Sequence, residues 1–283
     1  MSSTLRLLLR NPVSAAGLAV LSVLVVLAAL GPFVAPYGVN EVDVTATLQP
    51  PSAEHWFGTD DLGRDVLSRV ILAARVAFLV SVTSVSIALV AGVTLGLLSG
   101  YFGRWADAVI MRVVDVLFAF PVLLLAIAIV AVLGRGVTPT TIAIGVVYTP
   151  IFARVTRASV LSVREEPYVR AAVALGARPG RVILTHVLPN VTAPIIVQVS
   201  LSLAFAILSE AALSFLGLGV QPPEASWGRM LFDGRGFVDY WWMSVFPGMA
   251  IFLTVLAFNL VGDGLRDVLD PRQRSAIESG SGR

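Results

Sequence analysis

The side chains that could carry out chemistry are few and widely spaced in this 283-residue sequence. There is no cysteine, which excludes thiol nucleophiles, disulfides and thiolate metal sites. The only histidines, His55 and His186, lie too far apart in sequence for a His-Glu-x-x-His zinc site. There is no lysine, which excludes a Walker-type ATPase site and Schiff-base chemistry. We therefore expect no catalytic residue, metal ligand or cofactor in this chain.

One carboxylate, Glu210, lies in an apolar stretch with no basic residue within two helical turns. Ionisable residues at membrane depth are costly and are treated as functional candidates. Glu210 either bonds to Ser209, Ser214 or a neighbouring helix, or acts in a transport pathway or gate, and the sequence leaves both open. If Glu210 acts in a pathway, Ser209 and Trp227 in the following outer loop are further candidates.

Residues 165–190, which we call the knob, read EEPYVRAAVALGARPGRVILTHVLPN and form an arginine-bearing island between two apolar stretches. Acidic residues followed by proline favour a helix start, and we expect a short helix over Tyr168–Leu175 that ends at Gly176. Residues 178–180 then turn the chain, and a second helix follows over Val182–Leu188. A compact knob between two apolar stretches predicts a surface presented to a partner.

The elements that position these residues are membrane spans, because 57% of the residues are hydrophobic and only 13% are charged. A span needs about 20 mostly apolar residues. The sequence predicts an all-α polytopic membrane protein with six transmembrane helices: Val13–Val34, Val76–Leu98, Ala108–Leu133, Thr140–Leu161, Val191–Leu216 and Trp241–Val261.

The arginines predict the orientation of these spans through the positive-inside rule. With the N-terminus in the cytoplasm, fourteen arginines lie on the cytoplasmic side and six on the outer side. We therefore expect both termini and the knob to lie in the cytoplasm. The net charge of +2 is too small to indicate nucleic-acid binding, so the lipid bilayer is the expected environment.

This topology predicts three parts. Residues 1–75 hold the N-terminal tail, the first span and an outer segment, residues 76–268 form the core transmembrane domain with the knob, and residues 269–283 form a cytoplasmic tail. Within the outer segment we expect a helix over Thr59–Arg75, either lying on the membrane surface or contacting an external partner. Asp65 and Arg69 have the spacing of an ion pair on that helix.

Local signals inside the spans predict their packing. Ala91, Gly92, Gly96 and Gly100 give the second span a face of small residues that allows close helix contact. Pro121 and Pro150 should kink the third and fourth spans, through packing or as hinges. Arg112 and Asp115 lie three residues apart in the third span, which predicts a local ion pair.

Several motifs together resemble one family. The knob sequence YVRAAVALGARPGRVILTHVLPN resembles the EAA loop of ABC-importer permeases. Four other stretches resemble the C-type permease of dipeptide, oligopeptide and nickel importers: HWFGTDDLGRDVLSRV, MRVVDVLFAFP, LSEAALSFLGLGVQPPEASWGRML and FNLVGDGLRDVLDPR. The resemblance covers about residues 10–273, and the last four stretches narrow it to the peptide and nickel group.

The resemblance implies a type I ABC-importer permease fold with a cytoplasmic coupling helix. It implies that the chain moves di- or oligopeptides across the membrane by alternating access. The implied partners are a second homologous permease, two ATPase subunits that bind ATP and magnesium, and an external substrate-binding protein. The chain would then be a permease without ATPase activity of its own.

The resemblance also implies that the knob docks onto an ATPase subunit. Small side chains would let the knob fit closely into a groove of that subunit. Tyr168 and Leu175 would be apolar anchors, and the arginines would form a polar rim. The coupling residues that it carries over are Tyr168, Arg170, Ala171, Ala172, Leu175, Gly176 and Arg178. Arg170 departs from the family pattern, which has glutamate at this position, so its contact must be reversed or re-paired.

Alternative functions remain at this point. An importer of nickel or another non-peptide of the same group fits the same motifs, because substrate selection lies largely with the binding protein. A secondary transporter or channel would need several intramembrane carboxylates, whereas only Asp115 and Glu210 qualify. A membrane-embedded enzyme would need clustered catalytic residues, which this sequence lacks.

Overall fold

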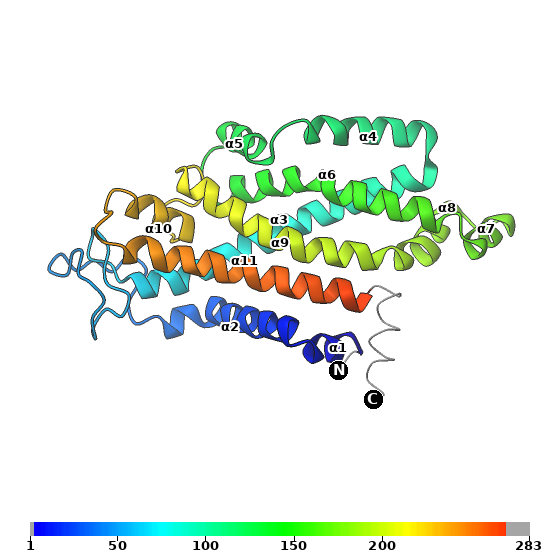
Figure 1. The fold of residues 1–283 in the computed structure, drawn as a ribbon. Helices are drawn as coiled ribbons and strands as arrows, with labels where there is room; N and C mark the ends of the chain where they lie inside the picture. The colour runs from blue at the N-terminus through cyan, green and yellow to red at the C-terminus, as the bar shows by residue number, and fades with distance from the viewer. Residues whose placement is uncertain (1–2, 270–283) are drawn as a thin grey trace.

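The computed structural model describes residues 3–269 as a long helical bundle without β-strands in that range (Figure 1). The prediction of an all-α protein is confirmed. The α-helices are α1 Ser3–Arg10, α2 Pro12–Val34, α3 Val66–Phe102, α4 Arg104–Phe118, α5 Val122–Leu133, α6 Val137–Val163, α7 Pro167–Ala174, α8 Pro179–Val182, α9 Thr192–Phe215, α10 Trp227–Gly234 and α11 Trp242–Leu269.

Four of these helices are long and apolar enough to cross a membrane, namely α2, α3, α9 and α11. The bent pair of α4 and α5 passes the same test when the two helices are taken together, and counting this pair as one span gives up to five spans. α6 is 27 residues long, but its threonines, Arg154 and Arg157 make it more polar than α2, α3, α9 and α11. The structure thus bears out a multi-pass membrane protein without fixing the number of spans at six.

The predicted third span is a broken helix rather than a kinked one. α4 and α5 differ in direction by 92° across the break at residues 119–121. Pro121 precedes the first residue of α5, where its missing N–H costs no helical hydrogen bond. Pro150, in contrast, lies within a continuous α6. Sequence reasoning found the position of the break but underestimated its size.

Glycines bring α3 and α6 into close contact at the centre of the bundle. A Cβ atom on Gly92 would lie 2.5 Å from Cβ of Phe152, and one on Gly96 would lie 2.6 Å from the carbonyl oxygen of Ala153. A Cβ on Gly100 would lie 2.8 Å from Val160. The predicted face of small residues is confirmed, and its role is to let the backbone of α3 approach α6.

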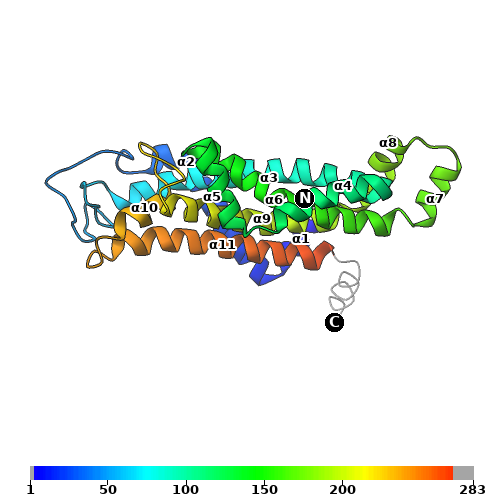
Figure 2. The same cartoon turned by 90° about the horizontal axis from the view of Figure 1, so that it is seen from above.

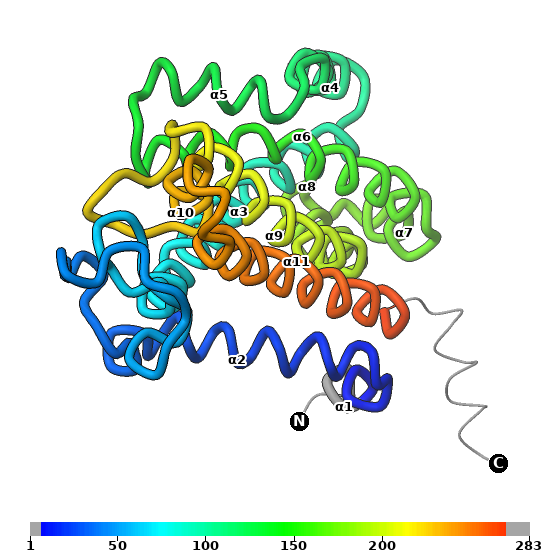
Figure 3. The backbone as a smooth tube through the Cα atoms, turned by 60° about the vertical axis from the view of Figure 1, so that its left-hand side comes forward, coloured from blue at the N-terminus to red at the C-terminus, as the bar shows by residue number. Residues whose placement is uncertain are grey.

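The bundle has two distinct ends (Figures 1 and 2). α7 and α8 project from one end, which α1 and the last turn of α11 also approach. The loop over residues 35–65 and α10 cover the other end. α4 and α5 lie along one side of the bundle, while α2 lies along the other (Figure 3). The predicted tail at 269–283 lies outside the described residues, except for Leu269.

The helix predicted over Thr59–Arg75 is wrong in its first half. Residues 59–65 form turns, and the helix begins at Val66 because Asp65 caps it by accepting from the N–H of Ser68 at 2.7 Å. Residues 66–75 are therefore the first turns of α3, which continues into the bundle. They do not form a separate helix lying on the membrane surface.

The close contact of α3 with α6 predicts a strong position dependence of glycine substitutions. Gly96→Ala should destabilise the protein by about 1–3 kcal/mol, because the added methyl group overpacks the contact. The matched variant is Gly248→Ala in α11, where a Cβ would meet no atom within 4 Å. Thermal unfolding of both purified variants measures the difference. Equal melting temperatures would contradict the contact.

Candidate functional sites at the two ends of the bundle

The knob begins with the helix that the sequence predicted. Glu166 is the N-cap of α7 and Pro167 its first residue, where the missing N–H leaves no helical bond unfilled. After Leu175 the chain leaves the helix through Gly176, whose φ of +80° favours glycine over any residue with a side chain. Local signals alone therefore fix the shape of this half of the knob.

The second half of the knob differs from the prediction. Pro179 and Gly180 belong to the first turn of α8, with Arg178 as its N-cap, and do not form a turn before it. The chain then continues as a π-helical turn over Ile183–Val187 and a 3-10 turn over Leu188–Asn190. The prolines at both ends explain the boundaries, because each is placed where a backbone N–H has no helical partner.

One apolar cluster holds the knob against the bundle. Val169 is its buried residue on α7, and it packs with Val160 at the end of α6 and with Val182 in α8. Leu97 on α3 and Ile195 on α9 complete the contact from the bundle side. Burying a valine contributes about 1.5–3 kcal/mol. The knob is therefore firmly seated rather than a loose loop.

Apolar side chains in and directly after α7 are also open to solvent. Leu175 is 88% exposed, and Tyr168 and Val173 are also exposed. A Cβ on Gly176 would meet no atom within 4 Å, so the surface beside Leu175 is free of other side chains. An exposed apolar group beside a flat glycine surface has the composition of a protein-docking site.

Arginines at the base of the knob pair within the chain. Nη2 of Arg170 lies 3.2 Å from Oε2 of Glu165, and Nε of Arg164 donates to the other oxygen of that carboxylate at 3.2 Å. Arg164 also donates to the carbonyl oxygen of Gly100 at the end of α3. The Arg170 pair is exposed, so it contributes about 0–1 kcal/mol and leaves the guanidinium available to a partner.

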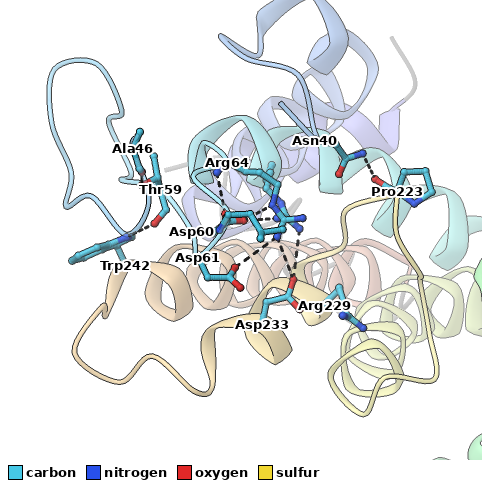
Figure 4. A network of polar contacts seen from close by, with 12 residues as sticks. Asn40, Ala46, Thr59, Asp60, Asp61, Arg64, Pro223, Arg229, Asp233 and Trp242 are labelled. Carbon is cyan, nitrogen blue, oxygen red and sulfur yellow. Dashed lines mark hydrogen bonds and ion pairs between the residues drawn. The ribbon is translucent and has the colours of Figure 1, made fainter. Parts of the chain in front are cut away.

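The other end of the bundle is closed by a group of buried charges, which we call the clasp: Asp60, Arg64, Arg69 and Asp233 (Figure 4). Oδ2 of Asp60 accepts from Nε of Arg64 at 2.7 Å and from Nη1 of Arg69. Asp233 on α10 lies 3.8 Å from both guanidinium groups. The clasp thus joins the loop before α3, α3 itself and α10.

The clasp replaces the ion pair predicted between Asp65 and Arg69. Asp65 instead faces Nδ1 of His55 at 3.0 Å and caps α3 through Ser68. The helix begins one residue after Asp65, so the i,i+4 rule for helix faces does not apply to it. Next to the clasp, Nε1 of Trp242 donates to the carbonyl oxygen of Thr59 at 2.9 Å (Figure 4).

Asp61 is the carboxylate next to the clasp. Burial raises the pKa of the Asp61 carboxyl, and the neighbouring Asp60 carboxylate raises that pKa further. Oδ1 of Asp61 is buried and has no hydrogen-bond partner among the described residues. Its nearest cation is Arg64, whose Nη2 lies 3.9 Å from Oδ1 of Asp61, which is too far for a hydrogen bond.

Glu210 is fully buried near the clasp end of α9 and is satisfied on one side only. Oε1 accepts from the hydroxyl of Ser214 at 2.7 Å, and that hydroxyl accepts from the N–H of Val220 at 3.0 Å. Oε2 forms no hydrogen bond of ordinary geometry within residues 3–269, although the Ser226 hydroxyl lies beside the carboxylate. Glu210 therefore fixes the turn that leads from α9 to α10.

Ser209 and Trp227, the other pathway candidates, lie on either side of Glu210 in different contacts. The Ser209 hydroxyl lies 3.1 Å from that of Tyr148 and links α9 to α6. Trp227 is buried at the start of α10, and its Nε1 donates to the carbonyl oxygen of Val70 at 2.9 Å. The three residues share one region, but they do not point into one cavity of this chain.

The ion pair predicted between Arg112 and Asp115 is wrong. Oδ1 of Asp115 accepts from Nη2 of Arg154 on α6 at 2.7 Å. Nearer the knob, Asp107 on α4 accepts from both Nη2 and Nε of Arg157 on α6. These two pairs tie α4 to α6, where apolar contact is sparse because α4 buries only Val114.

No group of three or more histidine, aspartate or glutamate side chains within residues 3–269 has the arrangement of a metal site. The polar groups that do cluster are ion pairs of opposite charge. The candidate sites are thus a docking surface at the knob and a structural clasp at the other end.

Two sequence families match this chain. Residues 92–275 match the family described as binding-protein-dependent transport system inner membrane component. The chain belongs to this family of transport permeases. Residues 1–51 of this permease match a second family, described as the N-terminal transmembrane domain of oligopeptide transport permease C. The family resemblance given by the motifs is therefore confirmed.

Similar proteins span nearly the whole permease. The dipeptide transport system permease protein DppC of Alkalihalophilus pseudofirmus is 48% identical over 94% of this chain and 88% of its own length. The di/tripeptide transport system permease protein DppC of Pseudomonas aeruginosa is 47% identical over 92% and 88%. The glutathione transport system permease protein GsiD of Pectobacterium atrosepticum is 43% identical over 95% and 90%.

The fold has a solved counterpart. A structure of the inward-facing MetNI methionine ABC transporter superposes with a TM-score of 0.58 at 15% identity, covering 71% of this permease and 96% of that chain. The permease thus has the type I ABC-importer fold that the resemblance implied.

The clasp predicts a large effect of one aspartate. Asp60→Ala should destabilise the permease by about 3–5 kcal/mol, because Arg64 and Arg69 would stay buried without their main partner. Asp239→Ala is the control, since Asp239 is exposed and forms no ion pair among the described residues. Melting temperatures of the two variants in detergent give the comparison. A shift for Asp60→Ala no larger than the control's would rule out the clasp as a stabilising group.

Proposed function

We propose that this chain is one of two permease subunits of an ATP-driven importer of di- or oligopeptides. The relatives named as dipeptide and di/tripeptide permeases support the peptide substrate. The other proposed subunits are a second homologous permease, two ATPases and an external substrate-binding protein. ATP and magnesium would bind to the ATPases alone, because this chain has no lysine for a P-loop.

The exposed apolar side chains of the knob are the observation that carries this proposal. Leu175, Tyr168 and Val173 are exposed at one end of the bundle, while Val169 is buried and seats α7 against the bundle. Such a surface suits a groove of an ATPase subunit. Ala171, Ala172 and Gly176 would allow close approach, and Arg170 and Arg178 would form the rim.

The proposed orientation places the knob, both termini and the last turn of α11 in the cytoplasm of a bacterial plasma membrane. Arginines at the knob end support it through the positive-inside rule. The clasp end would then face outward. We further propose that residues 76–268 form the core permease domain, that the first turns of α3 and the clasp move with it, and that residues 269–283 lie at its periphery.

Transport would proceed by alternating access. The knob continues directly from α6, so closure of the ATPases would move α6 and the α3 packed against it as one body. Glu210, Ser209 and Trp227 are proposed as the gate region near the outer end of the pathway. Their support is the half-satisfied Glu210 carboxylate beside the turn from α9 to α10.

Docking through Leu175 predicts a specific loss of coupling. Leu175→Asp should lower peptide-stimulated ATP hydrolysis by about tenfold or more, because a carboxylate would be forced into an apolar groove. Val238→Asp at the other end is the control, since Val238 is similarly exposed at 85%. Both rates are measured on reconstituted complexes with equal permease content. Full peptide stimulation of ATP hydrolysis in the Leu175→Asp complex would contradict the docking proposal.

The gate proposal predicts that the charge of Glu210 matters for uptake rather than for folding. Glu210→Gln keeps the oxygen that Ser214 binds, so the permease should fold, while uptake should fall about fivefold or more. Glu224→Gln is the control, because Glu224 is exposed in the loop between α9 and α10, and it should leave uptake unchanged. Uptake of a labelled dipeptide into proteoliposomes tests this. If the Glu210→Gln variant takes up the dipeptide as fast as the wild type, Glu210 has only a structural role.

A further inference from the structure

An ion pair lies half exposed on the side of the bundle formed by α4 and α6. Arg154 donates to Asp115 at 2.7 Å, and its guanidinium carbon lies 3.9 Å from the centre of the Phe118 ring. The side chains of Arg154 and Asp115 are nevertheless 48% and 56% exposed. The pair is thus held in place by α4 but is not enclosed by this chain.

Two helix lengths place this pair near the middle of the bilayer. The start of α4 and the end of α6 lie at one level, because Arg164 donates to the carbonyl oxygen of Gly100 just before α4. At 1.5 Å per residue, Asp115 lies about 16 Å from the start of α4 and Arg154 about 14 Å from the end of α6. On the proposed orientation, with these helix ends at the cytoplasmic surface of a hydrocarbon core about 30 Å thick, both values correspond to about half its depth.

Lipid and dry protein are both unsuitable neighbours for this pair. An arginine or aspartate facing lipid at the bilayer centre costs about 2.5–3.5 kcal/mol or more. An enclosed ion pair is tolerated only when its other hydrogen bonds are filled. Within residues 3–269, Arg154 forms one side-chain hydrogen bond and Arg112 on α4 forms none. Water can accept hydrogen bonds from the remaining N–H groups of both arginines.

We propose that Arg112, Asp115 and Arg154 line a water-filled stretch of the translocation pathway at mid-membrane. This inference rests on the proposed function. Arg112 lies one turn before Asp115 on the same face of α4, so the face carries two positive groups and one negative group. The excess positive charge repels divalent cations, whereas a zwitterionic peptide has no net charge to be repelled. The lining therefore favours a peptide substrate over nickel.

The absence of cysteine provides a direct test. Ala119 follows Arg112 and Asp115 at helical spacing, so Ala119→Cys places a thiol on the proposed pathway face. Ala29→Cys on α2 is the matched control, because both alanines are exposed and lie about 22–26 Å from the start of their helices. Membrane-embedded complete complexes are treated with an anionic methanethiosulfonate reagent, with and without ATP and vanadate.

The expected result is reaction at Ala119→Cys and none at Ala29→Cys, with a rate that differs between the two nucleotide states. The ratio of the reaction rate of the anionic reagent to that of a cationic reagent should be higher at Ala119→Cys than for a free thiol in solution. Adding Arg112→Gln should lower that ratio. Reaction at both positions, or at neither while the complex still imports dipeptide, would overturn the pathway assignment. Absence of ATP-dependent dipeptide uptake by the wild-type complex would instead refute the proposed function.

Discussion

Close packing of α3 against α6 is the interaction on which the rest of the structure depends. Gly92, Gly96 and Gly100 leave no room for a side chain between the two backbones. The contact runs from Ser84 at the middle of α3, which donates to the carbonyl oxygen of Thr141, to Val160 near the end of α6 where the knob begins. A pair of helices joined this closely moves as one body, because overpacking and separation both cost energy.

Polar contacts fasten both ends of this helix pair. At one end the clasp joins α3 to α10 through Asp60 and Asp233. At the other end Arg164 holds the end of α3 to the base of the knob, and the apolar cluster around Val169 seats α7. On the proposed function, this arrangement would carry a displacement of the knob to the outer end of the permease. α4 is attached mainly through Arg154 and Arg157, so it forms a more loosely packed side.

The sequence predicted what depends on local chemistry. Pro167 and Gly176 set the limits of α7, and the glycines of α3 marked a close helix contact. Partners distant in sequence were missed, because spacing rules consider one helix at a time. The rules paired Asp65 with Arg69 and Asp115 with Arg112, whereas the structure pairs Arg69 with Asp60 and Asp115 with Arg154. Only the tertiary arrangement brings those groups together.

The central claim is that the knob and the clasp end move as one rigid body. Spin labels on cysteines at Ala174 in the knob and Leu62 beside the clasp test it, because both positions are exposed and the chain has no other cysteine. Pulsed electron paramagnetic resonance would compare the complete complex without nucleotide and trapped with ATP and vanadate. The account predicts an unchanged distance within this chain, while the distance from Ala174 to the second permease changes. A changed distance between Ala174 and Leu62 would contradict it.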